Sequence, residues 1–316
     1  MPDFTAWKTD NYKFVGKAFK YAYDNRMNKL LSIVGVAHSK SVDYELTGSG
    51  GYGEMPEYDG HNLNEVQERR GFKTIVTPGE FSITRVVGYK QAKIDKSGAC
   101  AKVGALLGDS ASMTVYVHLL RMFSNAFNAD FKGGDDKPWA ASDHPNASKG
   151  SSGRKYIADP DAGTYSNLIN LSLSVASITK AQSQASRFVT PDGLPMLADM
   201  NLLLVSPELE ADAIKICGEN ARFRPTQNPA DNTNAANPLP NLQYMVLGGG
   251  KDGFSAKQWA LCDPTLMKQM VELVYITEPT VIQNQLDNPL KDAYTAYADF
   301  GSGWGDARQI IFSNPS

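Results

Sequence analysis

The longest periodic stretch of the sequence constrains the fold more than any other feature. Apolar or small residues recur every three or four positions from Gly98 to Phe127, which predicts one long amphipathic helix. The stripe consists of Ala99, Val103, Leu106, Ser110, Met113, Val117, Leu120, Phe123 and Phe127. Such a helix is on the order of 45 Å long, so the rest of the chain must pack along it as a spine. His118 lies beside the stripe and is interpreted as a packed helical histidine rather than a catalytic group.

Shorter patterns on both sides of this spine predict a mixture of helices and strands. Amphipathic spacing predicts helices from Asn11 to Leu31 and from Thr164 to Phe188. Ser206, followed by proline and an acid, has the pattern of a helix N-cap, Gly218 would end that helix, and Asp263 would begin another. The predicted strands are 42–46, 72–76, 80–87, 201–205, 242–247, 258–262, 271–276, 280–285, 293–300 and 307–312, with a turn at 301–303.

Three long segments show neither the periodicity of a helix nor that of a strand. They are a glycine-containing hairpin over 43–73, a tract rich in Gly, Pro, Ser and Asp over 132–163, and a polar tract over 219–241. Loops of this length are rare inside a compact domain and are usually functional, disordered, or ordered by a partner. A protein that stays a monomer would not account for three of them, so the sequence indicates contacts between copies.

Charge divides the N-terminal part of the chain into two segments of opposite sign. The first 31 residues have a net charge of +3, whereas residues 43–73 have a net charge of −4. The basic segment is either a solvated helix face or an arm that lies on an acidic neighbour. Because both segments show few large apolar residues, we expect them to meet between subunits and assembly to depend on salt.

The hairpin contains a glycine pattern that raises the question of a nucleotide site. Gly48, Gly50 and Gly53 match the dinucleotide-binding fingerprint and follow a predicted strand. The fingerprint also needs a helix directly after the glycines, and Pro56 and Gly60 exclude one. We therefore expect the flexible tip of a projecting loop rather than a phosphate site.

Other combinations of reactive side chains are equally incomplete. The four histidines are far apart and match no metal-binding spacing, and the three cysteines are too distant in sequence to suggest a disulfide framework. An acid–base pair would require Asp143 with His144, or Asp159 with Asp161, to act through partners elsewhere. Gly248–Lys251 lacks the spacing of a phosphate-binding loop. The sequence predicts no catalytic, cofactor-binding or metal-binding residues.

Composition excludes several further classes. The net charge of −3 gives no global excess of positive charge for binding nucleic acid, and the N-terminus lacks the pattern of a signal peptide. No apolar run approaches the ~18 residues of a membrane span. We expect a chain that folds in a cytoplasm and does not enter a membrane.

Several segments, taken in their order along the chain, resemble one family. After the glycine hairpin and the long helix, these are Trp139–Ala147, Gly163–Leu168, Leu202–Glu210 with Trp259–Pro264, and Ala298–Arg308. They resemble the major head proteins of tailed bacteriophages, particularly the Mu-like head subunit group. Together the segments cover most of residues 42–313, and their order is more specific than any single one.

The resemblance implies an α+β fold, the Hong Kong 97-like (HK97-like) phage capsid fold. Its parts would be an N-terminal arm (1–41), an E-loop (42–75), a P-domain with the spine helix at about 98–127 (76–160 and 271–316) and an A-domain (161–270). Members of the family often begin with a scaffolding segment that is removed during maturation. Here Met1 precedes the arm almost directly, so we expect a separate scaffold or none.

The resemblance also implies a function. The chain would be a major capsid protein that assembles through hexamers and pentamers into an icosahedral head, in the virion, after assembly in the bacterial host cytoplasm. Its partners would be further copies of itself, a portal protein, any scaffold or decoration proteins, and packaged double-stranded DNA held without sequence specificity. The alternatives are an encapsulin-type nanocompartment shell and, in a different class, a hydrolase using Asp143 and His144.

Overall fold

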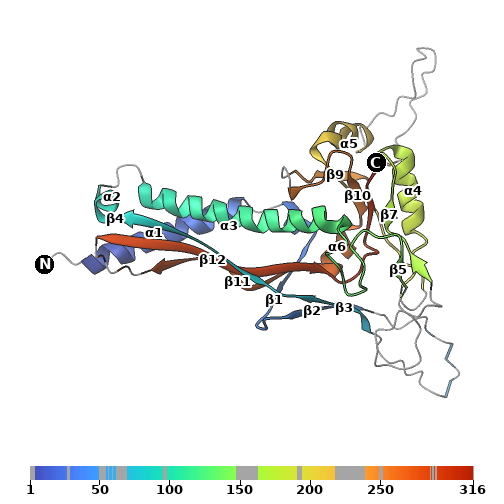
Figure 1. The fold of residues 1–316 in the computed structure, drawn as a ribbon, viewed down its shortest axis with the longest axis horizontal. Coiled ribbons are helices and arrows are strands. Elements are labelled where there is room, and N and C mark those ends of the chain that lie inside the picture. Colours follow the sequence, from blue (N-terminus) through green and yellow to red (C-terminus); the bar gives the residue numbers. More distant parts are fainter. Residues whose placement is uncertain are drawn as a thin grey trace, which may run out of the picture.

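The computed structural model describes residues 4–26, 29–49, 55, 57–58, 60–61, 70–94, 98–146, 163–190, 194–217, 239–248, 252–284, 286, 288 and 290–315. Over these residues the protein is elongated (Figure 1). A long body contains α3 (Ala99–Ser124), β11 (Val271–Asn284) and β12 (Lys291–Trp304), and a broader end carries the C-terminus. The predicted spine helix is present and runs along the long axis of the molecule.

The remaining elements alternate between helix and strand. The helices are α1 (Phe4–Asn25), α2 (Tyr89–Lys93), α4 (Val175–Ala185), α5 (Glu210–Ile216) and α6 (Pro264–Met270), with short 3-10 helices η1 (Lys29–Ser32), η2 (Asn125–Phe127) and η4 (Pro207–Leu209). The strands are β1 (Gly35–His38), β2 (Tyr44–Ser49), β3 (Arg70–Val76), β4 (Gly79–Gly88), β5 (His144–Pro145), β6 (Thr164–Tyr165), β7 (Leu168–Ile169), β8 (Leu202–Val205), β9 (Gln243–Val246), β10 (Trp259–Cys262) and β13 (Ile310–Ser313).

The body is built on a four-stranded sheet in the order β1-β11-β12-β4. β11 and β12 are antiparallel over their whole length, β4 is antiparallel to β12, and β1 is parallel to β11. Helices α1 and α3 pack together on one face of this sheet, where Val15, Leu107 and Tyr294 are buried in one cluster. The β2–β3 hairpin contacts the opposite face through Leu46 and Val76.

The broader end contains a five-stranded sheet in the order β7-β13-β10-β8-β9. β8 and β10 are buried at every position, so both faces of this sheet are covered. Alternate side chains of β8 face two different clusters: Leu204 joins the core shared with α3, and Leu203 joins a cluster under α4 and α5. Because the first cluster contains Phe300 of the first sheet and Phe312 of the second, together with Phe123 of the spine, the body and the broader end share one core.

The spine helix buries the predicted apolar stripe at Leu120 and Phe123, but over its first half it buries a different face. Leu106 and Met113 belong to the predicted stripe, yet their side chains are 58% and 46% exposed. The buried face instead contains Gly104, Leu107 and Gly108. Small residues form a helix interface by letting another backbone approach, and a count of large apolar residues does not detect such a face.

The turn predicted at 301–303 is wrong. β12 continues through Gly301 and Gly303 as far as Trp304 and pairs with β11 there. A Cβ atom on Gly303 would lie 2.5 Å from Val76 Cγ2, and one on Gly301 would lie 3.0 Å from Val76 Cγ1. These glycines therefore let the hairpin strand β3 cross close to the sheet, which is the reason that residues without side chains occupy a central strand.

The helix predicted from Thr164 to Phe188 is only half right. Its first part forms β6 and β7, and the helix α4 begins at Val175 after Ser174, whose Oγ accepts a hydrogen bond from the Ser177 amide at 3.1 Å. β7 pairs with β13, a partner far along the chain. Long-range strand pairing of this kind overrides the local helical spacing.

Two further predictions need smaller corrections. Ser206 is not a side-chain N-cap: its Oγ donates to the Ala256 carbonyl oxygen at 3.0 Å, and the 3-10 helix η4 precedes α5. The strands predicted at 271–276 and 280–285 form the single strand β11, with an irregular register between Tyr275 and Thr280. Asp263 is confirmed as the N-cap of α6, while Gly218 lies outside the described residues.

Candidate assembly surfaces and a buried polar junction

The N-terminal helix α1 is docked on the spine of its own subunit. A Cβ atom on Gly104 would lie 2.3 Å from the Val15 carbonyl oxygen, and one on Gly108 would lie 2.3 Å from the Phe19 carbonyl oxygen. The side chains of Val15 and Phe19 are buried in the contact. The expectation that this segment has little apolar surface to bury is therefore wrong for α1.

The other side of α1 keeps the basic character that the sequence indicated. Lys13, Lys17 and Lys20 are exposed. Near the end of the helix, Arg26 forms an ion pair with Asp109 of α3 at 3.0 Å. The exposed lysines form a solvated helix face within the subunit, and their contact with an acidic neighbouring subunit stays a prediction.

Over its described residues, the β2–β3 hairpin is anchored near its base, where the Gly134 amide also donates to Thr74 Oγ1 at 2.9 Å. Leu46 and Val76 are buried, whereas Ile75 of the same stem is 57% exposed. Lys73 pairs with Glu45 across the two strands, so one of the acidic residues is neutralised within the hairpin. The glycine tip from Gly50 to Gly53 lies outside the described residues.

A third surface lies between the spine and β4. Phe81 and Ile83 of β4, with Ser110 and Thr114 of α3, line a groove of about 240 Å³. β4 pairs with β12 on one side and is the edge strand of its sheet. An exposed edge strand beside an apolar groove is the kind of surface that subunits cover on assembly.

The segment 128–146 is packed into the subunit, although its sequence is aperiodic. Trp139 and His144 are fully buried, and Ala140 and Ala141 are nearly so. Trp139 stacks on Trp304 with ring centroids 5.2 Å apart. This half of the second aperiodic segment is therefore held by its own subunit, and residues 147–162 lie outside the described part.

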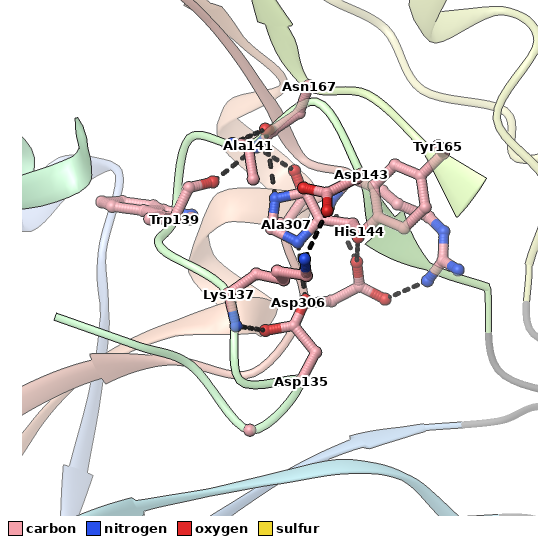
Figure 2. Close-up of polar contacts among 12 residues, drawn as sticks. Asp135, Lys137, Trp139, Ala141, Asp143, His144, Tyr165, Asn167, Asp306 and Ala307 are labelled. Atoms are coloured by element: carbon pink, nitrogen blue, oxygen red, sulfur yellow. Dashed lines mark hydrogen bonds and ion pairs between the residues drawn. The ribbon is translucent and has the colours of Figure 1, made fainter. Parts of the chain in front are cut away.

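Asn167 joins this loop to the broader end through four hydrogen bonds (Figure 2). Its Nδ2 donates to the carbonyl oxygens of Trp139 at 2.7 Å and Ala307 at 3.1 Å. Its Oδ1 accepts from the Ala141 amide at 2.9 Å and faces His144 Nε2 at 3.2 Å. The two carbonyl oxygens identify Nδ2 as the nitrogen of the Asn167 amide, and the Ala141 amide identifies Oδ1 as its oxygen. His144 Nε2 is therefore the donor to Oδ1.

His144 is held on three sides. Its Nδ1 lies 2.6 Å from Asp135 Oδ2, and its ring stacks on Tyr165 with centroids 5.1 Å apart. The Arg308 guanidinium lies 4.4 Å from the centre of the same tyrosine ring and pairs with Asp306. We name these residues, with Asn167, the polar junction; it ties the loop, β6 and the segment before β13 together.

The charges of the polar junction are compensated within it. Burial opposes the charge on the Arg308 guanidinium most strongly, but the combined effect of Asp306, Tyr165 and Asp135 outweighs burial and raises the pKa of Arg308. Burial, and then the charge of Asp306, raise the pKa of Tyr165 well above its usual value. Tyr165 is therefore a neutral donor to Asp306, and the junction is a structural network of paired charges.

The acid–base pair that a hydrolase would require is not formed. Asp143 pairs with Lys137, while His144 pairs with Asp135, so the two neighbours in sequence have separate partners (Figure 2). Asp159 and Asp161 lie outside the described residues. His118 is packed as predicted, with its ring at an edge-on angle to the stacked rings of Phe81 and Phe300. Burial, followed by the charge of Arg121, lowers the pKa of His118.

The remaining site predictions concern metals, cysteines and membranes. Within the described ranges, no group of three or more His, Cys, Asp or Glu side chains is placed to hold a metal ion. Cys100, Cys217 and Cys262 are free thiols, as predicted. The spine has the length and apolar composition of a membrane span, contrary to the sequence expectation, but core helices share that composition and α3 is packed against α1 and the sheet.

Solved structures share this fold, although no protein-family model and no curated protein matches the sequence. A virus-like particle from Pyrococcus furiosus has a TM-score of 0.52 and 10% identity over 96% of this chain and 99% of that chain. The procapsid of bacteriophage JBD30 has a TM-score of 0.52 and 12% identity over 100% of this chain and 76% of that chain. The capsid of Ralstonia phage GP4 has a TM-score of 0.51 and 14% identity over 90% and 87%.

These similarities identify the architecture. The chain has the α+β, HK97-like fold that the resemblance implied, with a long spine helix beside a long antiparallel sheet. The proteins that share the fold are shell-forming structural proteins. At identities of 10–14% the similarity concerns the fold, and activity has to be argued separately.

Proposed function

We propose that the chain is the major capsid protein of a tailed bacteriophage. It assembles through hexamers and pentamers into an icosahedral head that encloses the phage genomic DNA. The observation that supports this most is that the similarity to the JBD30 procapsid covers 100% of the chain, and so includes the N-terminal helix, the hairpin and both sheets. Surfaces that are apolar and exposed, at Leu106, Met113 and Ile83, are consistent with a subunit that is completed by its neighbours.

The domain division proposed for this subunit follows the family pattern. Residues 1–41 form the arm, 42–75 the E-loop, 76–160 and 271–316 the P-domain, and 161–270 the A-domain. The first sheet and the spine support the P-domain, and the second sheet supports the A-domain. β13 lies within the second sheet, so the end of the chain crosses from one proposed domain into the other.

The proposed partners follow from the same role. Further copies of the chain form the lattice, and a portal protein, a scaffold and decoration proteins complete the head. Double-stranded DNA is held by confinement, since the net charge of −3 supplies little adhesion. Assembly takes place in the cytoplasm of the bacterial host, and the finished protein resides in the virion.

A second candidate is an encapsulin-type shell that encloses a protein cargo. The specific observation in its favour is the similarity to the virus-like particle from Pyrococcus furiosus, which covers 99% of that chain. The two candidates differ in contents rather than in subunit structure. Nuclease-protected DNA inside particles from infected cells supports a phage head, whereas a stoichiometric co-purifying enzyme supports a compartment.

The direct test is to express the full chain and examine it by negative-stain microscopy and light scattering. Icosahedral shells, tubes, or rings of five and six subunits are the expected result. The subunit with residues 48–69 replaced by a short Gly-Ser turn should stay folded by circular dichroism but stop at small oligomers, because the buried residues of the described hairpin, Leu46 and Val76, lie outside the replaced segment. A wild-type chain that stays monomeric at high concentration would contradict the proposal.

A further inference from the structure

A groove at one edge of the second sheet offers apolar surface together with positive charge. It lies between α4 and residues 164–171, has a volume of about 750 Å³, and is lined by Leu168 and Phe188. Lys180 and Arg187 also line it and are exposed. Residues 163–190 contain no Asp or Glu, and neither cation has an ion-pair partner within the described part of the chain. The groove therefore carries two uncompensated positive charges.

The opposite edge of the same sheet carries negative charge. Helix α5 with its leading turn η4 packs beside β8 and β9, and Glu208, Glu210 and Asp212 are exposed there. Asp212 pairs with Lys215 at 2.8 Å, whereas Glu208 and Glu210 have no ion-pair partner among the residues described. Acids near a helix start stabilise its dipole, and that role leaves both carboxylates accessible to a partner.

We infer that the groove between α4 and β7 binds the acidic face of η4 and α5 from a second copy of the chain. The inference rests on the proposed function and specifies one of its subunit contacts. Charge complementarity selects the occupant, because the groove has two unpaired cations and the opposite edge has two unpaired carboxylates. The exposed side chain of Ile214, on α5, supplies an apolar group to the same contact.

The position of the two surfaces determines the kind of assembly. β7 and β9 are the two edges of one sheet, with three strands between them. A contact that joins opposite edges is head-to-tail, and such contacts close into rings when the rotation between copies is suitable. The contact therefore has the form required for a ring of five or six subunits.

The sharpest experiment exchanges the charges. Lys180→Glu with Arg187→Glu makes both edges acidic, and Glu208→Lys with Glu210→Lys makes both edges basic. In about 50 mM salt each double variant should lose assembled material by at least about tenfold, as judged by sedimentation velocity and microscopy. The quadruple variant carries both exchanges in one chain and should assemble like the wild type, because every contact is again between opposite charges.

A mixture of the two double variants sharpens the test further. Attraction then requires the variants to alternate around a ring, which is possible for six subunits but leaves one repulsive contact in a ring of five. The mixture should therefore form six-membered rings, sheets or tubes and few closed shells. Raising the salt concentration should reduce the differences between all the variants.

A matched control separates this contact from net charge. Lys132→Glu with Lys268→Glu makes the same change in charge outside the candidate assembly surfaces, and both side chains are exposed. This control should assemble normally. The inference is overturned if the control loses assembly to the same extent as the groove variant, or if the groove variant assembles like the wild type. It is also overturned if the groove variant fails to assemble while the variant Glu208→Lys with Glu210→Lys assembles normally. A wild-type chain that forms no oligomers contradicts the proposed function instead.

Discussion

The loop over 128–146 and the β2–β3 hairpin look alike in sequence, yet they pack differently against the subunit. Both are polar, glycine-containing and without a long period. The loop buries Trp139 and His144 completely and ends in the polar junction. Among its described residues, the hairpin buries only Leu46 and Val76 at its base, and Ile75 remains exposed.

The difference shows what an aperiodic segment can mean. Periodicity detects a face that one helix or strand presents to a core, but a loop enters a core through single large side chains and satisfied hydrogen bonds. Asn167 and His144 supply those bonds for the loop, whereas the described part of the hairpin has a cross-strand ion pair between Lys73 and Glu45 in an exposed position. Lack of period therefore does not distinguish a segment held by its own subunit from one that a partner holds, and the contact of the hairpin with a neighbouring subunit stays a prediction.

The largest expected effect is at Trp139. Trp139→Ala would leave a cavity against Trp304, Phe123 and Phe312 and should lower the free energy of unfolding by about 3–5 kcal/mol. Phe131→Ala is the matched control in the same loop, because Phe131 is half-exposed, and should change stability by less than about 1 kcal/mol. Urea denaturation measures the free energy of unfolding of both variants when it is followed by circular dichroism of the backbone, a signal that does not depend on tryptophan. Equal effects would mean that the loop does not belong to the core.

The next effect is at Asn167. Asn167→Ala removes the partner of two buried carbonyl oxygens, one backbone amide and His144 Nε2. Because an unsatisfied buried group costs about 1–3 kcal/mol and the losses are not additive, we expect a destabilisation of about 3 kcal/mol. Exposed Asn170 supplies the control variant Asn170→Ala. A thermal melt of Asn167→Ala indistinguishable from that of the control would refute the role of the polar junction.

A third change extends the comparison to α1. Gly104→Ala would favour an isolated helix, but its Cβ would lie 2.3 Å from the Val15 carbonyl oxygen, so we expect a net destabilisation of about 1–3 kcal/mol. Gly16→Ala on α1 is the control, since its nearest contact is Val281 Cγ1 at 3.9 Å; it should be neutral or stabilising by up to about 1 kcal/mol. Limited trypsin digestion should release α1 in the first variant. If both substitutions changed the free energy of unfolding in the same direction, helix propensity rather than packing would dominate at these positions.

The smallest effect on stability is expected for the hairpin. Replacing residues 48–69 by a short Gly-Ser turn keeps Leu46 and the pair between Glu45 and Lys73, so the free energy of unfolding should change by less than about 1 kcal/mol. Assembly of the same variant should fail. A loss of stability as large as that of Trp139→Ala would place the hairpin in the subunit core and remove the contrast with the loop.

Local sequence signals predicted a large part of the fold. The spine, the hairpin strands, β8, β10 and the N-cap Asp263 were each indicated by spacing or by a cap residue close in sequence. The helix predicted from Asn11 to Leu31 is right only up to Asn25, because α1 spans Phe4–Asn25 and a separate 3-10 helix follows at Lys29–Ser32. The candidate surfaces were harder to predict. Charge indicated the basic face of α1, but the groove beside α4 depends on β7, which pairs with a strand far along the chain.

The sequence by itself determined which segments have the apolar spacing of a helix or a strand, the charge of each segment, and the absence of local motifs for catalysis. Tertiary structure decided which face each element buries and which polar residues are paired. Gly104 and Gly303 illustrate the reason. From sequence alone, a glycine in a helix or a strand suggests a weak position or a turn, but here the Val15 backbone packs against Gly104 and the Val76 side chain packs against Gly303. His144 illustrates it again, because its partners Asp135 and Asn167 come together only through the packing of separate segments.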